Sequence, residues 1–186
     1  MIDRDLLKEI GNIGTGYAST ALYQLLGKIV NITTPRVDVV DMENVLNILE
    51  KFELENKLVV KLYAGLKGDI SGVVLVGFSK RCALLLTELL EKKGKTLNDV
   101  AEILINSYVE ALRKFLKLTI LVEDPKIIAT SGDLLAKLLS DLMEEKMCVF
   151  VKNHFKIEGT NINGDFYIVI GLSKAKKVVK MAEEFY

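Results

Sequence analysis

The clearest pattern in the chain is a helical periodicity of apolar residues that occurs twice. It predicts one amphipathic helix over residues 3–27 and another over residues 96–117, each with apolar side chains three or four positions apart on one face. The predicted core positions are Leu6, Ile10, Ile13, Tyr17, Ala21 and Leu25 in the first helix, and Leu97, Val100, Leu104, Tyr108, Ala111 and Phe115 in the second. Asp3 is the expected N-cap of the first helix, and Gly27 is its expected stop.

Segments typical of β-strands follow each helix in the same order. Residues 29–40 and 119–129 are rich in branched apolar residues, and each contains a proline that predicts a sheet edge, a bulge or a break. A short helix, two strands and a final helix then complete each half. These elements are predicted at residues 42–51, 57–64, 69–78 and 79–92, and again at 133–143, 147–157, 165–171 and 174–185. The tight turns within the two strand pairs are predicted near Lys67–Gly68 and at residues 161–164.

The repeated order of elements indicates an internal duplication. We expect an α+β fold in which two helix-and-sheet halves, approximately residues 1–93 and 94–186, are related by pseudo-two-fold symmetry. The two long helices should pack on a β-sheet, and residues 1–186 should form a single domain. Identity between the halves is low. At an offset of 90, the residues that recur unchanged between positions 9–35 and 99–125 are Ile13, Ala21, Leu22, Leu26 and Pro35.

Composition limits the classes of partner. The chain has 186 residues, of which 50% are hydrophobic, and its 25 basic residues balance 25 acidic ones. Because there is no net charge and no long basic run, nucleic acid is a poor partner. The apolar runs are far shorter than the roughly 20 residues that cross a bilayer, and the N-terminus does not resemble a signal peptide. We therefore expect a cytoplasmic protein with no membrane span.

Cysteine and histidine are too sparse to predict a metal centre. Cys82 and Cys148 are expected to be buried thiols, with a disulfide between them as the alternative. The single histidine, His154, lies in a stretch typical of a strand surface. These residues do not provide the ligand number and spacing of a zinc site, so no metal ligand is predicted.

A polar stripe accompanies the apolar pattern of the first helix. Asp5, Glu9 and Asn12 are spaced i, i+4 and i+7, so they share one helix face, and this face continues at Gly16. The stripe lies largely opposite the predicted core face and should point outward. Two interpretations follow from the residues alone: a solvated helix face, or a surface where an acid and an amide protrude together toward a partner.

Three glycines interrupt the same helix. Gly11, Gly14 and Gly16 fall close together, and each costs roughly 1 kcal/mol relative to alanine in a helix interior. Such a cost indicates a reason, for example the close approach of another backbone. A phosphate-binding loop is not favoured, because no strand precedes the glycines and their spacing is not that of a dinucleotide or P-loop fingerprint.

The residues around the stripe resemble the signature of the CheC/CheX/FliY chemotaxis phosphatases. The family motif reads Asp or Ser, three residues, Glu, two residues, Asn, 22 residues, Pro, and Asp5, Glu9, Asn12 and Pro35 satisfy every position. The local run Ile-Gly-Asn-Ile-Gly adds to the likeness. Because the CheC subgroup carries two tandem copies on a helix-and-sheet scaffold, the resemblance extends over nearly the whole chain.

The resemblance implies a phosphatase that acts on the aspartyl phosphate of the phosphorylated response regulator CheY. Glu9 and Asn12 would be the catalytic pair, while Asp5 and Gly16 would contact the partner. The helix glycines would let the backbone of the regulator come close. This chain would bind no cofactor, because the magnesium ion that the reaction needs belongs to the regulator.

The second copy of the motif departs from the pattern. Lys95, Asp99 and Glu102 occupy its first three positions. An ionised Glu102 repels phosphate and cannot donate a hydrogen bond to it, so Asp99 and Glu102 are expected to form a degenerate second site. Asn106 lies one helical turn further along, about 6 Å away, which is too far for it to hold the same water in the same way.

Two other functions stay open. The main alternative is an adaptor that mostly binds the receptor deamidase CheD and phosphorylated regulator, with weak turnover. A flagellar-switch subunit is less favoured, since no switch-binding domain follows the second repeat. A two-copy chain can satisfy internally what single-copy relatives satisfy by dimerising, so a monomer is expected.

Overall fold

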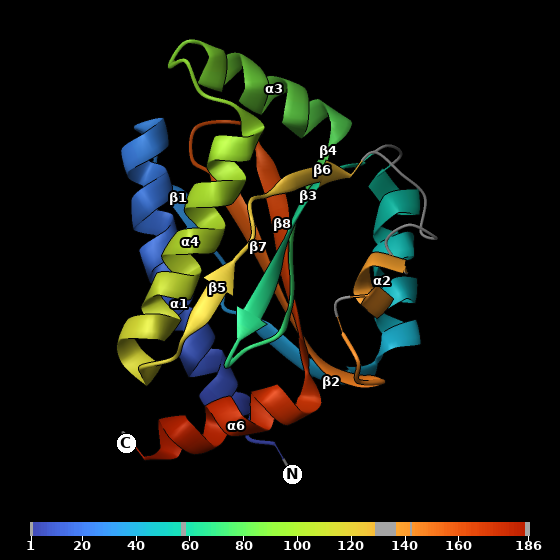
Figure 1. The fold of residues 1–186 in the computed structure, drawn as a ribbon. Helices are drawn as coiled ribbons and strands as arrows, with labels where there is room; N and C mark the ends of the chain where they lie inside the picture. Colours follow the sequence, from blue (N-terminus) through green and yellow to red (C-terminus); the bar gives the residue numbers. More distant parts are fainter. Residues whose placement is uncertain (1, 57–58, 129–136, 142, 185–186) are drawn as a thin grey trace.

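An antiparallel sheet forms the framework of the molecule (Figure 1). The computed structural model describes residues 2–56, 59–128, 137–141 and 143–184. Within these residues the sheet has eight strands in the order β1-β7-β8-β4-β3-β5, with β2 also paired to β7 and β6 also paired to β3. The strands are β1 (Val30–Ile32), β2 (Arg36–Asp41), β3 (Val59–Gly68), β4 (Gly72–Ser79), β5 (Ile120–Val122), β6 (Lys126–Ile128), β7 (Met147–Ile157) and β8 (Asn163–Gly171).

Helices cover the sheet on both faces. They are α1 (Arg4–Leu26), α2 (Met42–Asn56), α3 (Lys80–Glu91), α4 (Leu97–Leu116) and α6 (Leu172–Glu183), and residues 137–141 are also helical. In Figure 1, α1 and α4 lie side by side over one face and run in opposite directions, while α2 lies on the other side of the sheet and α3 and α6 lie at its two ends. The α+β class and the packing of two long helices on a sheet are therefore confirmed.

Two hydrophobic cores lie on either side of the sheet. The larger core joins the sheet to α1, α3, α4 and α6, and the smaller core joins it to α2. Strand β4 contributes to both: Val74, Val76 and Phe78 face the larger core, whereas Val73 and Leu75 face the smaller one. Because both faces of this strand are covered, all its residues from 72 to 78 are buried, and its sequence shows no polar alternation.

The two halves of the chain exchange their edge strands. Strands β1 and β2 pair with β7, so that Val30 lies opposite Ile157. Strands β5 and β6 pair with β3, so that Val122 lies opposite Leu66. The centre of the sheet is the pairing of β4 with β8. The described elements follow the predicted order in both halves, whereas the exchange of edge strands was not predicted, and the duplication itself stays a prediction.

The predicted strand breaks agree with the structure, and so does the first predicted turn, because the hairpin connection between the paired residues Leu66 and Gly72 contains Lys67 and Gly68. Strand β3 continues through Gly68, and the chain turns at residues 69–71. Gly68 has φ 111° and pairs with Ile120, and a side chain there would collide with the carbonyl oxygen of Thr119. The glycine is required by the close approach of β5.

The second hairpin turns earlier than its Asn-Gly sequence predicts. Asn163 and Gly164 are already in β8, and the turn lies at residues 158–162, where Gly159 has φ 71°. A Cβ on Gly164 would lie 2.5 Å from Cζ of Phe155, so this glycine makes room for an aromatic ring across the hairpin. Of the helix predicted over residues 133–143, residues 133–136 and 142 lie outside the described residues.

The buried face of α1 is rotated by about one residue from the predicted one. Among the predicted core positions Ile10 is buried, whereas Ile13 is half-buried and Tyr17 is 40% exposed. The residues that are buried are Leu7, Ile10, Gly11, Gly14, Thr15, Ala18, Leu22 and Leu26. The prediction failed because glycine, alanine and threonine carry little hydrophobicity, yet their small size lets a neighbouring helix approach closely.

Both cysteines are buried and free, as expected, so the disulfide alternative is not formed. His154 is exposed on β7, as its strand-surface context predicts. No helix in the described part of the chain has both the length and the apolar character needed to cross a membrane.

Candidate functional site

Helix α1 is fixed at both ends by the residues that the sequence predicts. The Asp3 carboxylate accepts hydrogen bonds from the backbone N–H groups of Asp5 and Leu6, at 3.0 and 2.9 Å. At the other end Gly27 adopts φ 68°, and its N–H donates to the Tyr23 carbonyl at 2.8 Å. These caps satisfy backbone groups that would otherwise lack partners, and they set the register of the helix.

The four predicted site residues of the first copy are all exposed along α1. They are Asp5, Glu9, Asn12 and Gly16. Asp5 forms an ion pair with Lys8, with 2.9 Å between Oδ1 and Nζ. No hydrogen bond or ion pair to another described residue engages the side chain of Glu9 or Asn12. The acid and the amide therefore protrude together from the helix and are available to a partner.

An open groove of about 840 Å³ runs between α1 and α4 beside Asn12. Its walls combine polar and aromatic side chains from both helices. They are Asn12, Ile13, Gly16, Tyr17, Thr20, Ala21 and Gln24 on α1, and Asn106, Ser107, Glu110 and Arg113 on α4. Asn106 thus lines the same groove as Asn12 from the facing helix, whereas Glu9 and Asp5 lie outside it.

The α4 wall of the groove carries a network of charged side chains. The Arg113 guanidinium donates to the carbonyl oxygen of Ile120, with an Nε–O distance of 3.0 Å, and its Nη1 lies 3.4 Å from Glu110. Lys114 lies 3.7 Å from Glu110 and 5.7 Å from the ring centroid of Tyr17. Because these groups hold one another, the wall has a defined charge pattern beside the exposed amide.

The two glycines that flank Asn12 serve contacts inside the molecule. A Cβ on Gly11 would lie 2.6 Å from Cγ of Pro35, and one on Gly14 would lie 2.6 Å from Cδ2 and Cε2 of Tyr108. The interpretation that all three helix glycines admit the backbone of a partner is therefore wrong for Gly11 and Gly14. A Cβ on Gly16 would meet nothing within 4 Å, so its proposed contact with a partner stays a prediction.

Pro35 has a structural place that explains its spacing in the motif. It is buried in the segment between β1 and β2, and its ring contacts α1 at Gly11, the residue before Asn12. The 22 residues between Asn12 and Pro35 are the remainder of α1, its cap and β1. A connection of this length brings Pro35 back into contact with the turn of α1 that carries Asn12.

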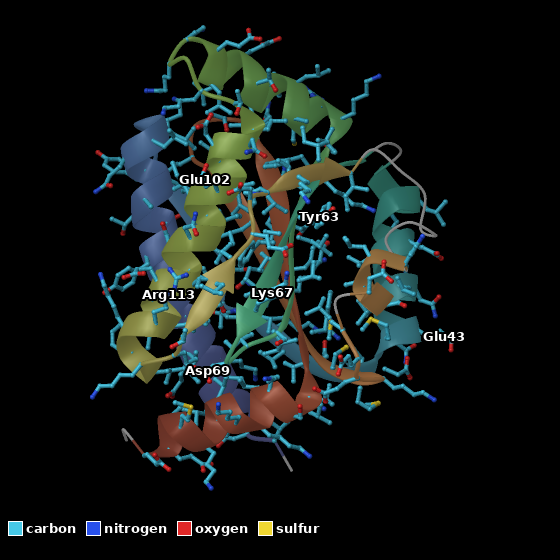
Figure 2. The ribbon with its side chains drawn as sticks, in the orientation of Figure 1. Glu43, Tyr63, Lys67, Asp69, Glu102 and Arg113 are labelled. Carbon is cyan, nitrogen blue, oxygen red and sulfur yellow. The ribbon has the colours of Figure 1, made fainter. Side chains whose placement is uncertain are left out.

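The degenerate second position has a different local structure. Asp99 and Thr96 form a capping box: the Asp99 carboxylate accepts from the N–H of Thr96 at 2.7 Å and from its hydroxyl at 2.8 Å. The Thr96 hydroxyl, and then its backbone N–H, lower the pKa of Asp99 below its ordinary value. Glu102 is exposed on the upper half of α4, away from Arg113 (Figure 2).

Helix α4 therefore starts too late to repeat the geometry of α1. Arg4 is the first residue of α1, and its counterpart at an offset of 90 is Gly94, yet α4 begins at Leu97. Asp99 consequently falls in the first turn, where its carboxylate serves the helix end. That Asp99 and Glu102 are inactive stays a prediction.

Several residues of the site could not be predicted from the sequence. The contact of Tyr108 with α1 and the groove residues Glu110 and Arg113 depend on how two remote helices pack. The available signal was the run of small residues on α1, which favours a close neighbour with a large side chain. Within the described residues, no group of three or more histidines, cysteines or carboxylates could hold a metal ion.

The sequence and the fold both resemble known chemotaxis and flagellar proteins. The model of the CheC-like family matches residues 2–38. The solved structure of FliY from Thermotoga maritima aligns with a TM-score of 0.76 at 21% identity, covering 98% of this chain and 96% of that chain. The FliM middle domain from Vibrio alginolyticus aligns with a TM-score of 0.65 at 15% identity, covering 95% of this chain and 99% of that chain.

A third solved structure is a CheX–CheY complex with BeF3 and Mg2+ from Borrelia burgdorferi. It aligns with a TM-score of 0.54 at 14% identity, covering 86% of this chain and 96% of the matched chain. The solved structures show the fold, and the family model matches the stretch that contains Glu9, Asn12 and Pro35. Together they confirm the resemblance to CheC/CheX/FliY-type chemotaxis proteins.

Proposed function

We propose that this chain dephosphorylates the aspartyl phosphate of a CheY-type response regulator, with one active site on α1. The observation that carries this proposal is the exposed pair Glu9 and Asn12, one turn apart and unengaged by described residues, with Asn12 on an open groove. The match of the CheC-like family to residues 2–38 supports it, because the pair lies inside that stretch.

The proposed role of Asn12 is to place the attacking water. An acyl phosphate is already reactive, so its hydrolysis mainly requires a water molecule in line with the leaving oxygen. The carboxamide oxygen of Asn12 can accept a hydrogen bond from this water, while its NH2 group can donate to a phosphoryl oxygen. Being neutral, the amide adds no negative charge beside an anionic transition state.

Glu9 is proposed to dock the regulator by pairing with a lysine of its phosphorylation site. A carboxylate is unsuited to hold the phosphoryl group itself, but it can accept charge-assisted hydrogen bonds from an ammonium group. Asp5 and Gly16, at the two ends of the exposed stripe, would contact the same partner. The CheX–CheY structure with BeF3 and Mg2+ supports a metal-bearing regulator as the partner. We propose that the magnesium ion arrives with the regulator.

We propose that the second copy has no catalytic role and that the chain is a duplicated, pseudo-two-fold molecule with one active site. The exchanged edge strands β1 and β5 and the matched order of elements support the duplication. Asp99 supports the inactivity of the second face, since its carboxylate is engaged by Thr96 at the end of α4. With both long helices in one chain, we propose that the protein works as a monomer.

The second candidate function is a binding module with little or no turnover. The FliM middle domain supports this alternative because it shares the fold. In this case the groove between α1 and α4 would hold phosphorylated regulator without hydrolysing it, and another surface could bind a CheD-type deamidase. The same exposed residues would then affect affinity and not rate.

Turnover separates the two functions. A phosphorylated CheY-type regulator in large molar excess over this chain should lose its phosphoryl group to completion, and Asn12→Ala should reduce the rate roughly 10²- to 10³-fold. The regulator alone, with the same magnesium concentration, provides the baseline. A loss of phosphoryl groups that stops at one per molecule of this chain, or that Asn12→Ala leaves unchanged, would refute the phosphatase.

A further inference from the structure

Asn12 lies on a short segment of α1 that is held from two sides. Tyr108 of α4 contacts Gly14, and its hydroxyl oxygen lies 3.2 Å from the position of a Cβ on Gly11. Pro35 contacts Gly11 from the β1–β2 segment. A third restraint is the hydroxyl of Thr15, which donates to the backbone carbonyl of Asn12 at 2.9 Å.

Tyr108 is itself held firmly against the sheet. The side chain is 4% exposed, and its ring centroid lies 5.3 Å from that of Phe166 on β8, with an interplanar angle of 55°. Burial raises the pKa of the Tyr108 hydroxyl, so it stays neutral at physiological pH. The contacts from Phe166 through Tyr108 to Gly14 therefore connect the sheet to the part of α1 that carries the amide.

This arrangement is one-sided, although the chain has two long helices of similar pattern. At an offset of 90, the counterparts of Gly11 and Gly14 are Ala101 and Leu104, and the counterpart of Tyr108 is Ala18. The pair of glycines and the tyrosine ring that packs against them are therefore present beside Asn12 and absent at the corresponding positions beside Glu102. General packing of one helix on another would not require this asymmetry, since Ala101 and Leu104 are also buried in α4.

We propose that Tyr108 is a positioning residue for Asn12. Its ring sets the distance between α1 and α4 at Gly14 and the rotation of α1 about its axis, and so places the carboxamide in the groove. The inference rests on the proposed phosphatase function, and in it the second half of the chain positions a side chain of the first half. Misplacing a reacting group by about 1 Å can cost roughly 100-fold in rate. A van der Waals contact with ring carbons, without a hydrogen bond, is sufficient for this role.

A set of size-exchange variants tests the contact. Gly14→Ala adds a methyl group against the ring, and Tyr108→Leu removes ring carbons, so each should lower kcat roughly tenfold or more with KM changed less than about twofold. The double variant Gly14→Ala/Tyr108→Leu should recover much of kcat, because the added methyl group occupies the space that the smaller side chain leaves. Tyr108→Phe keeps the ring and should keep kcat.

Matched controls separate positioning from general stability. Tyr23→Leu makes the same change at an exposed tyrosine of α1 and should leave kcat unchanged. Gly16→Ala makes the same change as Gly14→Ala without a steric collision, so it should raise the unfolding temperature whereas Gly14→Ala should lower it. All rates are divided by the folded fraction measured by circular dichroism.

The side-chain NH2 signals of Asn12 in a 1H–15N spectrum provide a readout that needs no substrate. These signals should shift in Gly14→Ala and return toward their wild-type positions in the double variant. If the single variants keep wild-type kcat and Asn12 signals, or if the double variant is no better than the worse single variant, the inference is wrong. If wild type does not turn over regulator, the phosphatase fails, and the Asn12 signals alone decide whether Tyr108 positions the amide.

Discussion

The carboxylate of Asp99 and the hydroxyl of Thr96 lie 2.8 Å apart and close the N-terminus of α4 as a capping box. At the corresponding place on α1, Asp3 caps the helix, and Glu9 lies a turn and a half further on. The acid of the second copy thus stabilises a helix end, whereas the acid of the first copy points to solvent. The motif position that holds an exposed acid in the first half is therefore used to cap a helix in the second half.

Asp99→Asn is expected to lower the unfolding temperature near pH 6 and to have less effect in acid. The pKa of Asp99 is lowered in the folded protein by hydrogen bonds from Thr96, so the ionised carboxylate stabilises the fold above the unfolded pKa of about 4. This contribution is lost as pH falls through the folded pKa. Thermal unfolding of both proteins between pH 6 and pH 2.5 tests this, and a difference that does not narrow in acid would contradict it.

Asn12→Asp is expected to reduce regulator dephosphorylation roughly 10²- to 10³-fold. The substitution keeps the size of the side chain, but it removes the NH2 donor and places a negative charge near the phosphoryl group. Initial rates at saturating phosphorylated regulator are the measurement. Asn47→Asp on the exposed side of α2 introduces the same charge on the other side of the sheet and is the matched control. Equal rates for the two variants would show that Asn12 has no special role.

Glu102→Ala is expected to leave turnover within about twofold of wild type. Glu102 is exposed on α4 and is not among the residues that line the groove, so its removal changes neither Asn12 nor the walls beside it. The measurement is the initial rate of phosphoryl loss, compared in parallel with Glu9→Ala, which should weaken docking. A large decrease for Glu102→Ala would establish that the second face participates.

Lys61 is expected to make the protein more stable as pH rises from about 8 to about 10.5. This side chain on β3 is only 5% exposed, and burial lowers its pKa from 10.5 to about 8, against an opposing contribution from Glu50. Between these values the unfolded chain binds a proton that the folded chain has released, so the free energy of unfolding increases with pH. Lys61→Met should remove this dependence.

Urea unfolding of wild type and Lys61→Met at several pH values between 7.5 and 10 isolates the effect of Lys61, because the other titrating groups are common to both proteins. The difference in unfolding free energy should change by no more than about 1.4 kcal/mol for each unit of pKa shift. Parallel curves for the two proteins would show that the lysine keeps an ordinary pKa.

Asn153→Val is expected to increase the free energy of unfolding by about 1 kcal/mol or more. Asn153 on β7 is fully buried opposite Phe166, and both polar atoms of its side chain lack a hydrogen-bond partner within the described residues. A branched apolar side chain removes this desolvation cost and suits a strand. Chemical denaturation measures the change, and Asn31→Val, at an exposed position of β1, controls for strand propensity. Destabilisation would indicate that the native amide has a partner.

The sequence was most informative where chemistry is local. Asp3 and Gly27 predict the ends of α1 because caps depend on a few neighbouring residues, and Glu9 and Asn12 were expected on an exposed face because helix geometry alone places them there. The motif position held by Asn12 and the altered motif position held by Glu102 can also be identified from the sequence alone.

Prediction failed for residues whose role depends on a contact with a residue far away in the sequence. Gly68 and Gly164 resemble turn residues in the sequence. In the structure a side chain at either position would collide with Thr119 or Phe155 of a neighbouring segment, and this contact requires the glycine. The contact between Gly14 and Tyr108 could not be predicted for the same reason, because the sequence alone does not show which helices pack against each other.

The exchange of edge strands has a consequence for synthesis of the chain on the ribosome. Val30 of β1 pairs with Ile157, and 157 − 30 leaves 127 residues to be made before that partner exists. At a translation rate of about 5–20 residues per second, β7 becomes available for pairing roughly 6–25 s after β1 has been synthesised. During this time β1 has no strand partner, so the sheet is completed only after β7 has been synthesised.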